Sequence, residues 1–251
     1  ALGAARSVAL ARQAGEVLGR ELAALGINVN YAPCADVNIN PHNPVVGTRS
    51  FGEDPELVGT LAAAMIEGIQ SQGVAATVKH FPGHGDTASD SHHGLACVPH
   101  ALERLKAVEL LPFRAACKAG ARMVMTAHLA IPSIDGPGAP PATLSPNIIQ
   151  GLLRGELGFE GVVVTDAMDM RAIRQGEWLG EECVRAARAG ADCLLMTSDG
   201  QDQARAYTAL LAAAQSGRLA AGELQASLGR IARLKAWLAD QPAAPDLSVI
   251  G

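Results

Sequence analysis

Apolar and polar positions follow two rhythms along this chain. Short apolar runs rich in β-branched residues have the length of strands, and longer segments repeat apolar residues at three- and four-residue steps, as one face of a helix does. The strand-length runs are Ile27–Ala32, Val74–Lys79, Arg122–Ala127, Gly161–Thr165 and Asp192–Met196. The helical segments are Ala1–Leu25, Pro55–Gln72, Ala101–Ala119, Pro146–Leu157, Trp178–Ala189, Asp202–Ser216 and Ala221–Leu238.

Glycines mark where several of these helical segments end. A glycine suits the left-handed position just after a helix. The five candidates for that position are Gly26, Gly73, Gly120, Gly158 and Gly190. Strands that alternate with helices of this length predict βαβ units and a parallel sheet.

Polar residues gather where the predicted strands end. A doubly wound sheet usually carries a glycine-rich phosphate-binding turn after its first strand, and no GxGxxG or GxxxxGK[ST] sequence occurs here. A (β/α)8 barrel instead carries its chemistry in the loops after its strands. This chain has such polar clusters at Asp36, Lys79–Asp86, Thr126–His128 and Thr165–Asp166. The pattern favours the barrel.

The strand count falls short of a closed barrel. Five strands are predicted where a barrel of this type has eight, and the chain begins within a helical segment. We therefore expect a TIM-type α/β barrel truncated at its N-terminus. Residues 1–240 would form this partial barrel, and residues 241–251, rich in Pro and Ala, would form a tail or linker.

Composition narrows the class of protein further. The 251 residues are 49% hydrophobic and 18% charged, with a net charge of −5, which excludes a disordered chain and argues against a nucleic-acid-binding surface. No apolar run approaches the roughly 20 residues that a membrane helix needs. The five cysteines contain no CxxC pair, so a disulfide framework or a thiolate zinc site is not indicated.

Side chains capable of catalysis are most concentrated in residues 79–93, whose sequence is KHFPGHGDTASDSHH. One interpretation is a metal-dependent hydrolase whose ligands are His80, His84, Asp86 and His128. A serine triad around Ser91 is disfavoured, because adjacent residues on one loop rarely reach the required geometry. A third interpretation is an acid/base dyad, since Asp90 and His92 fall on one side of an extended stretch and a carboxylate raises the pKa of a neighbouring imidazole.

A nucleophile would have to come from another strand end. Asp166 follows an apolar strand, where an unpaired carboxylate is costly unless it is functional, although it also fits the N-cap of a following helix. Arg49 and Lys79 could hold a hydroxylated substrate, and Asp36 fits either loop formation or the lining of a site.

Three segments together resemble one enzyme family. KHFPGHGDTASDSH, NPVVGTRSFGEDP and GFEGVVVTDAMDM are similar to motifs of glycoside hydrolase family 3, specifically of its β-N-acetylhexosaminidase branch. The resemblance runs from about residue 8 to residue 238, with each motif at a predicted strand end. The family also has an Asp-Gln-Glu-Gly-Gly-like segment on an earlier strand, which this chain does not contain.

The resemblance implies a fold and a mechanism. The fold would be a TIM-type barrel, Asp166 the nucleophile, and His92 the acid/base assisted by Asp90. The expected substrate-binding residues are Arg49, Lys79, His80 and His128. The implied activity is retaining removal of terminal β-linked N-acetylglucosamine by double displacement, often from peptidoglycan fragments.

The resemblance and the composition together give the expected partners and location. We expect a small carbohydrate substrate, no metal or other cofactor, no nucleic acid, no membrane segment in this chain and a cytoplasmic location. A metal-dependent hydrolase, or an inactive truncated fragment that binds sugar, remains as the alternative.

Overall fold

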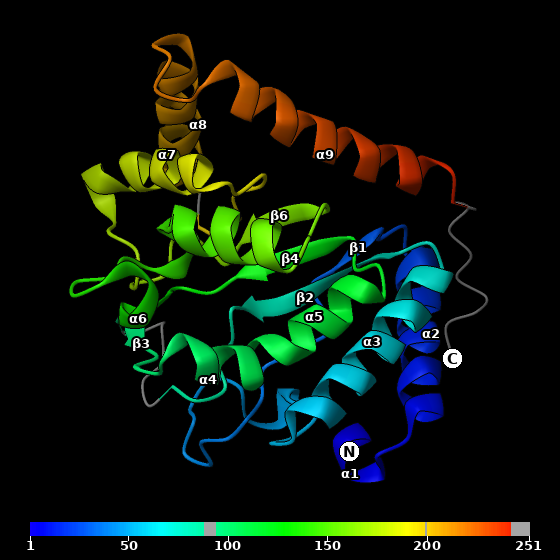
Figure 1. The fold of residues 1–251 in the computed structure, drawn as a ribbon. Coiled ribbons are helices and arrows are strands. Elements are labelled where there is room, and N and C mark those ends of the chain that lie inside the picture. Colours follow the sequence, from blue (N-terminus) through cyan, green and yellow to red (C-terminus); the bar gives the residue numbers. More distant parts are fainter. Residues whose placement is uncertain (88–93, 199, 242–251) are drawn as a thin grey trace.

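Four parallel strands form the sheet on which the chain is built (Figure 1). In the computed structural model, which describes residues 1–87, 94–198 and 200–241, these strands are β1 (Val29–Asn30), β2 (Ala75–Phe81), β4 (Met123–Thr126) and β6 (Val162–Thr165). Their order across the sheet, β1-β2-β4-β6, is their order in the sequence. Each strand is therefore added beside the previous one after a helical crossover, as in the wall of a barrel.

The fifth predicted strand lies beside β6 but forms only part of a ladder. Cys193 bridges to Val164 in parallel register, and its carbonyl accepts a hydrogen bond from the Thr165 amide at 3.0 Å. The amide of Leu195 donates instead to the Thr165 side chain, also at 3.0 Å. Because a side chain replaces the backbone partner there, the expectation of a full strand over Asp192–Met196 is wrong. The sequence also did not predict a short parallel pair of β3 (Ala96–Cys97) with β5 (Leu129–Ala130).

Two predicted helices are each divided in two. Residues 1–25 form α1 (Leu2–Ala5) and α2 (Val8–Ala24), because the Ser7 hydroxyl accepts a hydrogen bond from the Leu10 amide and starts a new helix. Residues 101–119 form α4 (Leu102–Ala107) and α5 (Leu110–Lys118).

The helix α3 (Pro55–Ser71) begins as its sequence predicts, with Asp54 as N-cap and Pro55 in the first turn. It packs closely against α2: a side chain at Gly68 would place its Cβ 2.2 Å from the Arg12 carbonyl oxygen. Glycine is therefore required where these two helices cross.

The second half of the chain continues the alternation. After β4 come α6 (Pro132–Asp135), η2 (Ala142–Leu144) and the π-helix η3 (Asn147–Glu156); after β6 come η4 (Gly176–Trp178), α7 (Leu179–Ala189), α8 (Gly200–Gln215) and α9 (Ala221–Ala239). The short helix η1 (Gly47–Arg49) precedes α3. All five glycines predicted to follow helices have positive φ, from 68° to 110°. The prediction of those helix ends is confirmed.

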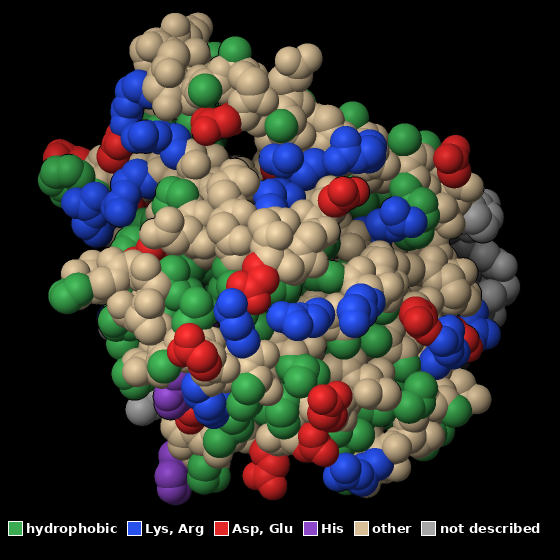
Figure 2. All heavy atoms as spheres, in the orientation of Figure 1, with side chains coloured by type: hydrophobic (Ala, Val, Ile, Leu, Met, Phe, Trp, Pro, Cys, Tyr) green, Lys and Arg blue, Asp and Glu red, His purple; other side chains and the backbone are tan. Residues whose placement is uncertain are grey.

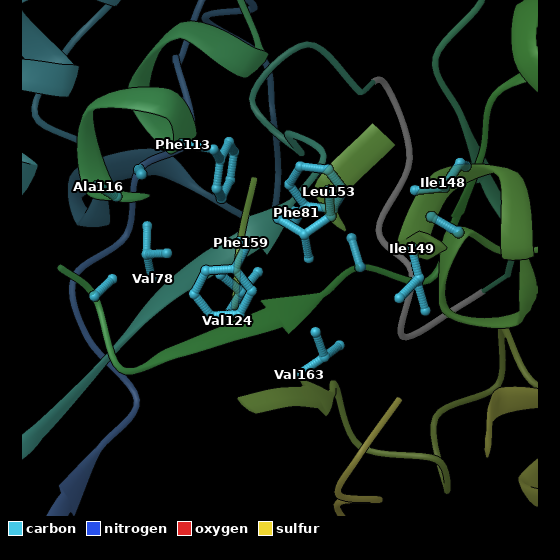
Figure 3. Packing of buried hydrophobic residues seen from close by; sticks show 14 of the residues in the cluster. Val78, Phe81, Phe113, Ala116, Val124, Ile148, Ile149, Leu153, Phe159 and Val163 are labelled. Carbon is cyan, nitrogen blue, oxygen red and sulfur yellow. The ribbon is translucent and has the colours of Figure 1, made fainter. Parts of the chain in front are cut away.

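The core lies between the sheet and the helices on one of its faces (Figure 3). Val78, Phe81 and Val124 of the sheet are fully buried there. The rings of Phe81 and Phe113 meet edge to face, with their centroids 5.3 Å apart, so α5 is packed directly on β2.

The helix α9 covers the other side of the sheet (Figure 1). Its residues Ile231 and Leu234 pack against a second apolar cluster formed by β4 and β6. The Asp192 carboxylate, fully buried, pairs with Arg154 and Arg230 at 2.8 Å each and so ties α9 to the strands at their N-terminal ends. Loops surround the opposite end of the sheet, where the strands have their C-terminal ends.

Charges of both signs are interspersed on the face drawn in Figure 2. A hollow between α7, α8 and α9 on this face corresponds to a cavity of about 600 Å³. No helix in the described part of the chain is long and apolar enough to cross a membrane.

Candidate active site

A cavity of about 540 Å³ opens where the strands end. This volume falls within the roughly 300–1,000 Å³ of typical small-molecule sites. Three of the four residues expected to bind the substrate line this cavity, together with the expected nucleophile. The lining residues are Tyr31, Val45, Arg49, Lys79, His80, His84, Met125, Asp166, Ala167, Asp169, Met170, Arg171, Leu195 and Thr197.

Asp36 organises the wall that carries the two histidines. Its segment runs in parallel beside the end of β2, where Ala35 donates its amide to the Lys79 carbonyl at 2.7 Å. One carboxylate oxygen, Oδ1, then accepts the backbone N–H of His84 at 2.7 Å, and Oδ2 lies 2.7 Å from Nδ1 of His80. Because an ionised carboxylate only accepts, Nδ1 of His80 is the donor and Nε2 is left to face the cavity.

Electrostatics keeps Asp36 ionised. Burial opposes the charge, but the charges and hydrogen bonds of His80 and His84 outweigh it and hold the pKa of Asp36 well below its ordinary value. Burial lowers the pKa of His84, and neighbouring Asp36 only partly offsets this. This wall of the cavity therefore carries an ionised carboxylate that is hydrogen-bonded to the His80 ring.

Lys79 and Arg49 place two cations on the same cavity. Lys79 is half-buried and its side chain forms no hydrogen bond or ion pair with any described residue, so its ammonium group is available to a ligand. Burial, and then the nearby Arg49, lower its pKa, while Asp166 acts in the opposite direction. Arg49 is held on η1 by a hydrogen bond of 2.6 Å to the Val45 carbonyl.

Asp166 stands at the end of β6 with one oxygen unoccupied. Its amide donates to the Thr126 carbonyl at 3.1 Å, which fixes the backbone to β4. Its Oδ1 accepts the Ala167 amide at 2.8 Å, whereas Oδ2 has no hydrogen-bond partner among the described residues. A half-buried carboxylate with a free oxygen beside a lysine can act as a nucleophile.

His128 lies beneath the cavity rather than on its wall. It is fully buried, with Nε2 2.9 Å from the Ala167 carbonyl oxygen and Nδ1 2.8 Å from the Thr143 hydroxyl. A carbonyl can only accept, so Nε2 carries the proton. In the structure His128 therefore does not line the cavity as expected, and its ring holds the backbone that follows Asp166.

Comparison with known proteins shows the family of this chain. Residues 1–234 match the glycosyl hydrolase family 3 N-terminal domain. The chain belongs to glycosyl hydrolase family 3. The N-terminal domain of this family is a TIM-type barrel, so the expected fold class is confirmed.

The chain is similar to curated beta-hexosaminidases and to a solved structure. The chain is 41% identical over 244 residues to beta-hexosaminidase A of Pseudoalteromonas piscicida and 40% identical over 192 residues to a beta-hexosaminidase of Stenotrophomonas maltophilia (strain R551-3). These alignments cover 91% and 76% of this chain, and 41% and 56% of the relatives.

The solved structure is that of a family 3 β-N-acetylglucosaminidase from Paenibacillus sp. str. FPU-7. It is 52% identical, with a TM-score of 0.93, and the match covers 97% of this chain and 46% of that one. This family 3 chain thus spans about half the length of the relatives that it matches.

Two residues important to the site were missed from the sequence. Asn43 joins two loops of the family 3 site: its amide nitrogen donates to the His84 carbonyl at 2.8 Å, and its oxygen accepts the Val46 amide at 2.8 Å. Tyr31 lines the cavity directly after β1. Tyr31 falls within the predicted strand Ile27–Ala32, so its position gave no signal, whereas Asn43 begins the segment NPVVGTRSFGEDP and could have been found through that motif.

The predicted acid/base dyad lies outside the described residues. Asp90, Ser91 and His92 all fall within residues 88–93. Their roles therefore stay predictions that depend on the resemblance to family 3.

The proposed metal ligands are not brought together. Among the described residues, the groups with at least three potential ligand atoms in mutual reach are Cys34, Asp36 and His80, and Asp86, His100 and Glu109. The Asp86 carboxylate is 2.7 Å from Nε2 of His100, and both nitrogens of His128 bond to protein oxygens. The structure thus gives no support to a site built from His80, His84, Asp86 and His128.

Buried histidines make acid destabilisation of this protein an expected result. Burial lowers the pKa of both His84 and His128 below the ordinary 6.5. The unfolded chain then binds more protons than the folded one below pH 6.5, so stability is complete above that pH and falls as the pH drops. The slope that each such histidine contributes is at most about 1.4 kcal/mol per pH unit.

Urea unfolding at several values between pH 7.5 and 5 measures this slope. His128→Gln removes one buried imidazole and should flatten it, whereas the matched control His42→Gln removes an exposed one and should leave the parent slope. Equal slopes in the parent and in His128→Gln would contradict the conclusion that burial lowers the pKa of His128.

Proposed function

We propose that this protein is a retaining exo-β-N-acetylglucosaminidase. The single observation that carries the proposal is the Asp166 carboxylate, whose free oxygen shares a cavity with Lys79, His80 and Arg49 at the C-terminal end of the strands. The name of the Paenibacillus relative, a β-N-acetylglucosaminidase at 52% identity, supports the choice of sugar.

The first step forms a covalent intermediate. Asp166 attacks the anomeric carbon through an oxocarbenium-like transition state, the bond from that carbon to the leaving oxygen breaks, and His92 as imidazolium gives its proton to that oxygen. In the second step neutral His92 takes a proton from water, the water oxygen attacks the anomeric carbon, and Asp166 is released with net retention. Asp90 would orient the His92 ring.

The charges on the cavity wall favour an imidazole, rather than a second carboxyl group, as the general acid. Most retaining glycosidases use a second carboxyl group about 5–5.5 Å from the first. The other carboxylate on this wall is Asp169, which accepts hydrogen bonds from the Thr197 hydroxyl at 2.7 Å and the Thr197 amide at 3.2 Å. Although burial acts in the opposite direction, these bonds lower the pKa of Asp169, so it is ionised near neutral pH and has no proton to donate.

The sugar hydroxyls would be held by two charged donors and one acceptor. Lys79 and Arg49 supply the charged donors, and Nε2 of the neutral His80 ring accepts, because Nδ1 carries the proton that is donated to Asp36. We propose terminal N-acetylglucosamine on peptidoglycan-derived fragments as the substrate and the cytoplasm as the location.

The test is hydrolysis of 4-nitrophenyl β-N-acetylglucosaminide, with the corresponding β-glucoside as the comparison substrate. We expect release from the N-acetyl substrate to persist in EDTA, because no step uses a metal. His92→Ala should lower kcat/KM by about 10²-fold or more for an unactivated disaccharide and much less for an activated aryl glycoside, whose leaving group needs little protonation. Cleavage of the disaccharide by His92→Ala at the parent rate would contradict the acid/base assignment.

A further inference from the structure

A cavity of about 350 Å³ lies at the end of the sheet opposite the candidate active site. It is bounded by the turns that lead into β4 and β6 and by one side of α9. Its volume is near the lower end of the range for small-molecule sites. The charged residues that line it are Arg122, Glu160, Arg230 and Arg233. The proposed reaction does not involve this cavity, so its charges need a separate explanation.

Positive charge at this cavity exceeds the negative charge that is paired with it. Arg230 contacts the buried Asp192 carboxylate, which also pairs with Arg154. Arg233 is exposed, and its side chain donates one long hydrogen bond of 3.5 Å to the Glu160 carbonyl. Neither Arg233 nor the Glu160 carboxylate forms an ion pair with any described residue. Two guanidiniums therefore share one carboxylate, and a third has no anionic partner in the part of the chain that the structure describes.

Arg122 adds a further unpaired cation from the other side of the cavity. Its guanidinium carbon lies 4.5 Å from the centroid of the Trp237 ring, which is a cation–π contact. Its side chain forms no hydrogen bond or ion pair with any described residue. Trp237 belongs to α9, so this contact joins the turn before β4 to that helix. The N–H donors of Arg122 are therefore available to a ligand.

The neighbouring Arg154 shows the effect of this excess charge. Burial lowers the pKa of Arg154, Asp192 acts in the opposite direction, and the charges of Arg230 and Arg233 lower it further. Its Nε atom is buried and has no hydrogen-bond partner among the described residues. Like charges held this close raise the free energy of the folded protein, and a bound anion would lower it. The whole chain has a net charge of −5, so its composition does not explain this local excess of cations.

We propose that this cavity binds a small multivalent phosphate anion, either inorganic or carried by a small phosphate ester. Guanidiniums form paired, charge-assisted hydrogen bonds with phosphate oxygens, and here they come from α9 and from the turn before β4. More than one cation lacks a partner, which favours a multivalent anion over a single carboxylate. The bound anion would bridge α9 to the strands that it covers. The site is separate from the proposed reaction, and its test does not depend on hydrolysis.

The two tryptophans of the chain allow a local test. Trp178→Phe removes the exposed one and leaves Trp237, whose ring contacts Arg122, as the single tryptophan. Titration of this variant with inorganic pyrophosphate at constant ionic strength should give a saturable change in fluorescence, because the anion draws the guanidinium away from the ring. Pyrophosphate bound only in the other cavity, at Lys79 and Arg49, would leave the fluorescence of Trp237 unchanged. A parallel titration with glycerol 3-phosphate distinguishes an inorganic anion from a phosphate ester, and saturable binding of either one supports the proposal.

Arg233→Met, added to Trp178→Phe, should raise the dissociation constant by about tenfold, because one charged hydrogen-bond donor is lost. The matched control is Arg188→Met in the same background. It removes another exposed arginine that has no ion pair with any described residue, on the wall of the cavity between α7, α8 and α9, and it should keep the affinity. The absence of a saturable change with both anions would overturn the proposal, and so would equal affinities with and without Arg233→Met.

Discussion

Replacing Asp166 with Ala should abolish turnover of 4-nitrophenyl β-N-acetylglucosaminide, with a loss of about 10⁴-fold or more in kcat, the order found when an enzyme loses its covalent nucleophile. The fold should survive, because among the described residues the Asp166 side chain accepts one hydrogen bond, from the adjacent Ala167 amide. The same thermal midpoint in variant and parent would show that chemistry, not folding, was lost.

Azide separates the nucleophile from the acid/base. In Asp166→Ala the small anion can occupy the vacated position and attack the anomeric carbon of an activated substrate, which inverts the configuration and gives the α-azide. Loss of an acid/base residue would instead leave the first step intact and give the β-azide. Nuclear magnetic resonance of the product distinguishes the two, and a β-azide from Asp166→Ala would contradict its role.

Asp169→Ala is the matched control, since it removes a carboxylate from the same turn and the same cavity. Asp169 accepts hydrogen bonds from Thr197 and has no role in bond cleavage, so its loss should lower kcat by about tenfold or less, through movement of the turn. A loss as large as that of Asp166→Ala would point to two catalytic carboxylates and away from an imidazole acid.

Features fixed by neighbouring residues could be predicted from the sequence. The five glycines that follow helices and the Asp54-Pro55 start of α3 need only local geometry, and the structure shows them as expected. The cavity at the strand ends was also predictable, because parallel strands bring their C-terminal ends to one edge. Lys79, His80 and Asp166 share that cavity for this reason.

Features fixed by distant partners could not be predicted. His128 was expected on the wall, but Thr143 and Ala167, 15 and 39 residues away, take both of its ring nitrogens. The fifth strand is incomplete because the Thr165 hydroxyl, 30 residues earlier, takes the Leu195 amide. In each case hydrogen bonds to a distant segment decide the outcome, and the pattern of apolar residues does not indicate them.

Asp36 is the clearest case of a residue whose role depends on distant partners. Its removal has the second largest expected effect, a loss of stability. In the sequence it fits either loop formation or site lining; in the structure it accepts hydrogen bonds from residues 44 and 48 positions away and lies 3.1 Å from the Cys34 sulfur. Asp36→Ala leaves two backbone amides and the Nδ1–H of His80 buried without an acceptor. We expect it to lower the free energy of unfolding by about 3–5 kcal/mol.

Activity should fall with stability in this variant, because the His80 ring loses the bond that turns Nε2 toward the cavity. Asp36→Asn should not restore it: an amide has one acceptor oxygen, so its nitrogen faces either the Nδ1–H of His80 or the backbone N–H of His84, a donor against a donor. Urea unfolding at pH 7.5 and kcat/KM on the chromogenic substrate, below the unfolding transition, measure the two effects separately.

The control is Asp54→Ala, which removes an exposed carboxylate that also accepts two backbone amides, at the N-terminus of α3. Loss of such a cap costs about 1 kcal/mol, and this residue lies outside the cavity. Burial is the difference between the two carboxylates, so Asp36→Ala should cost about three times as much as Asp54→Ala or more. Equal losses would mean that water reaches the amides around His80, and that Asp36 is not what orients the ring.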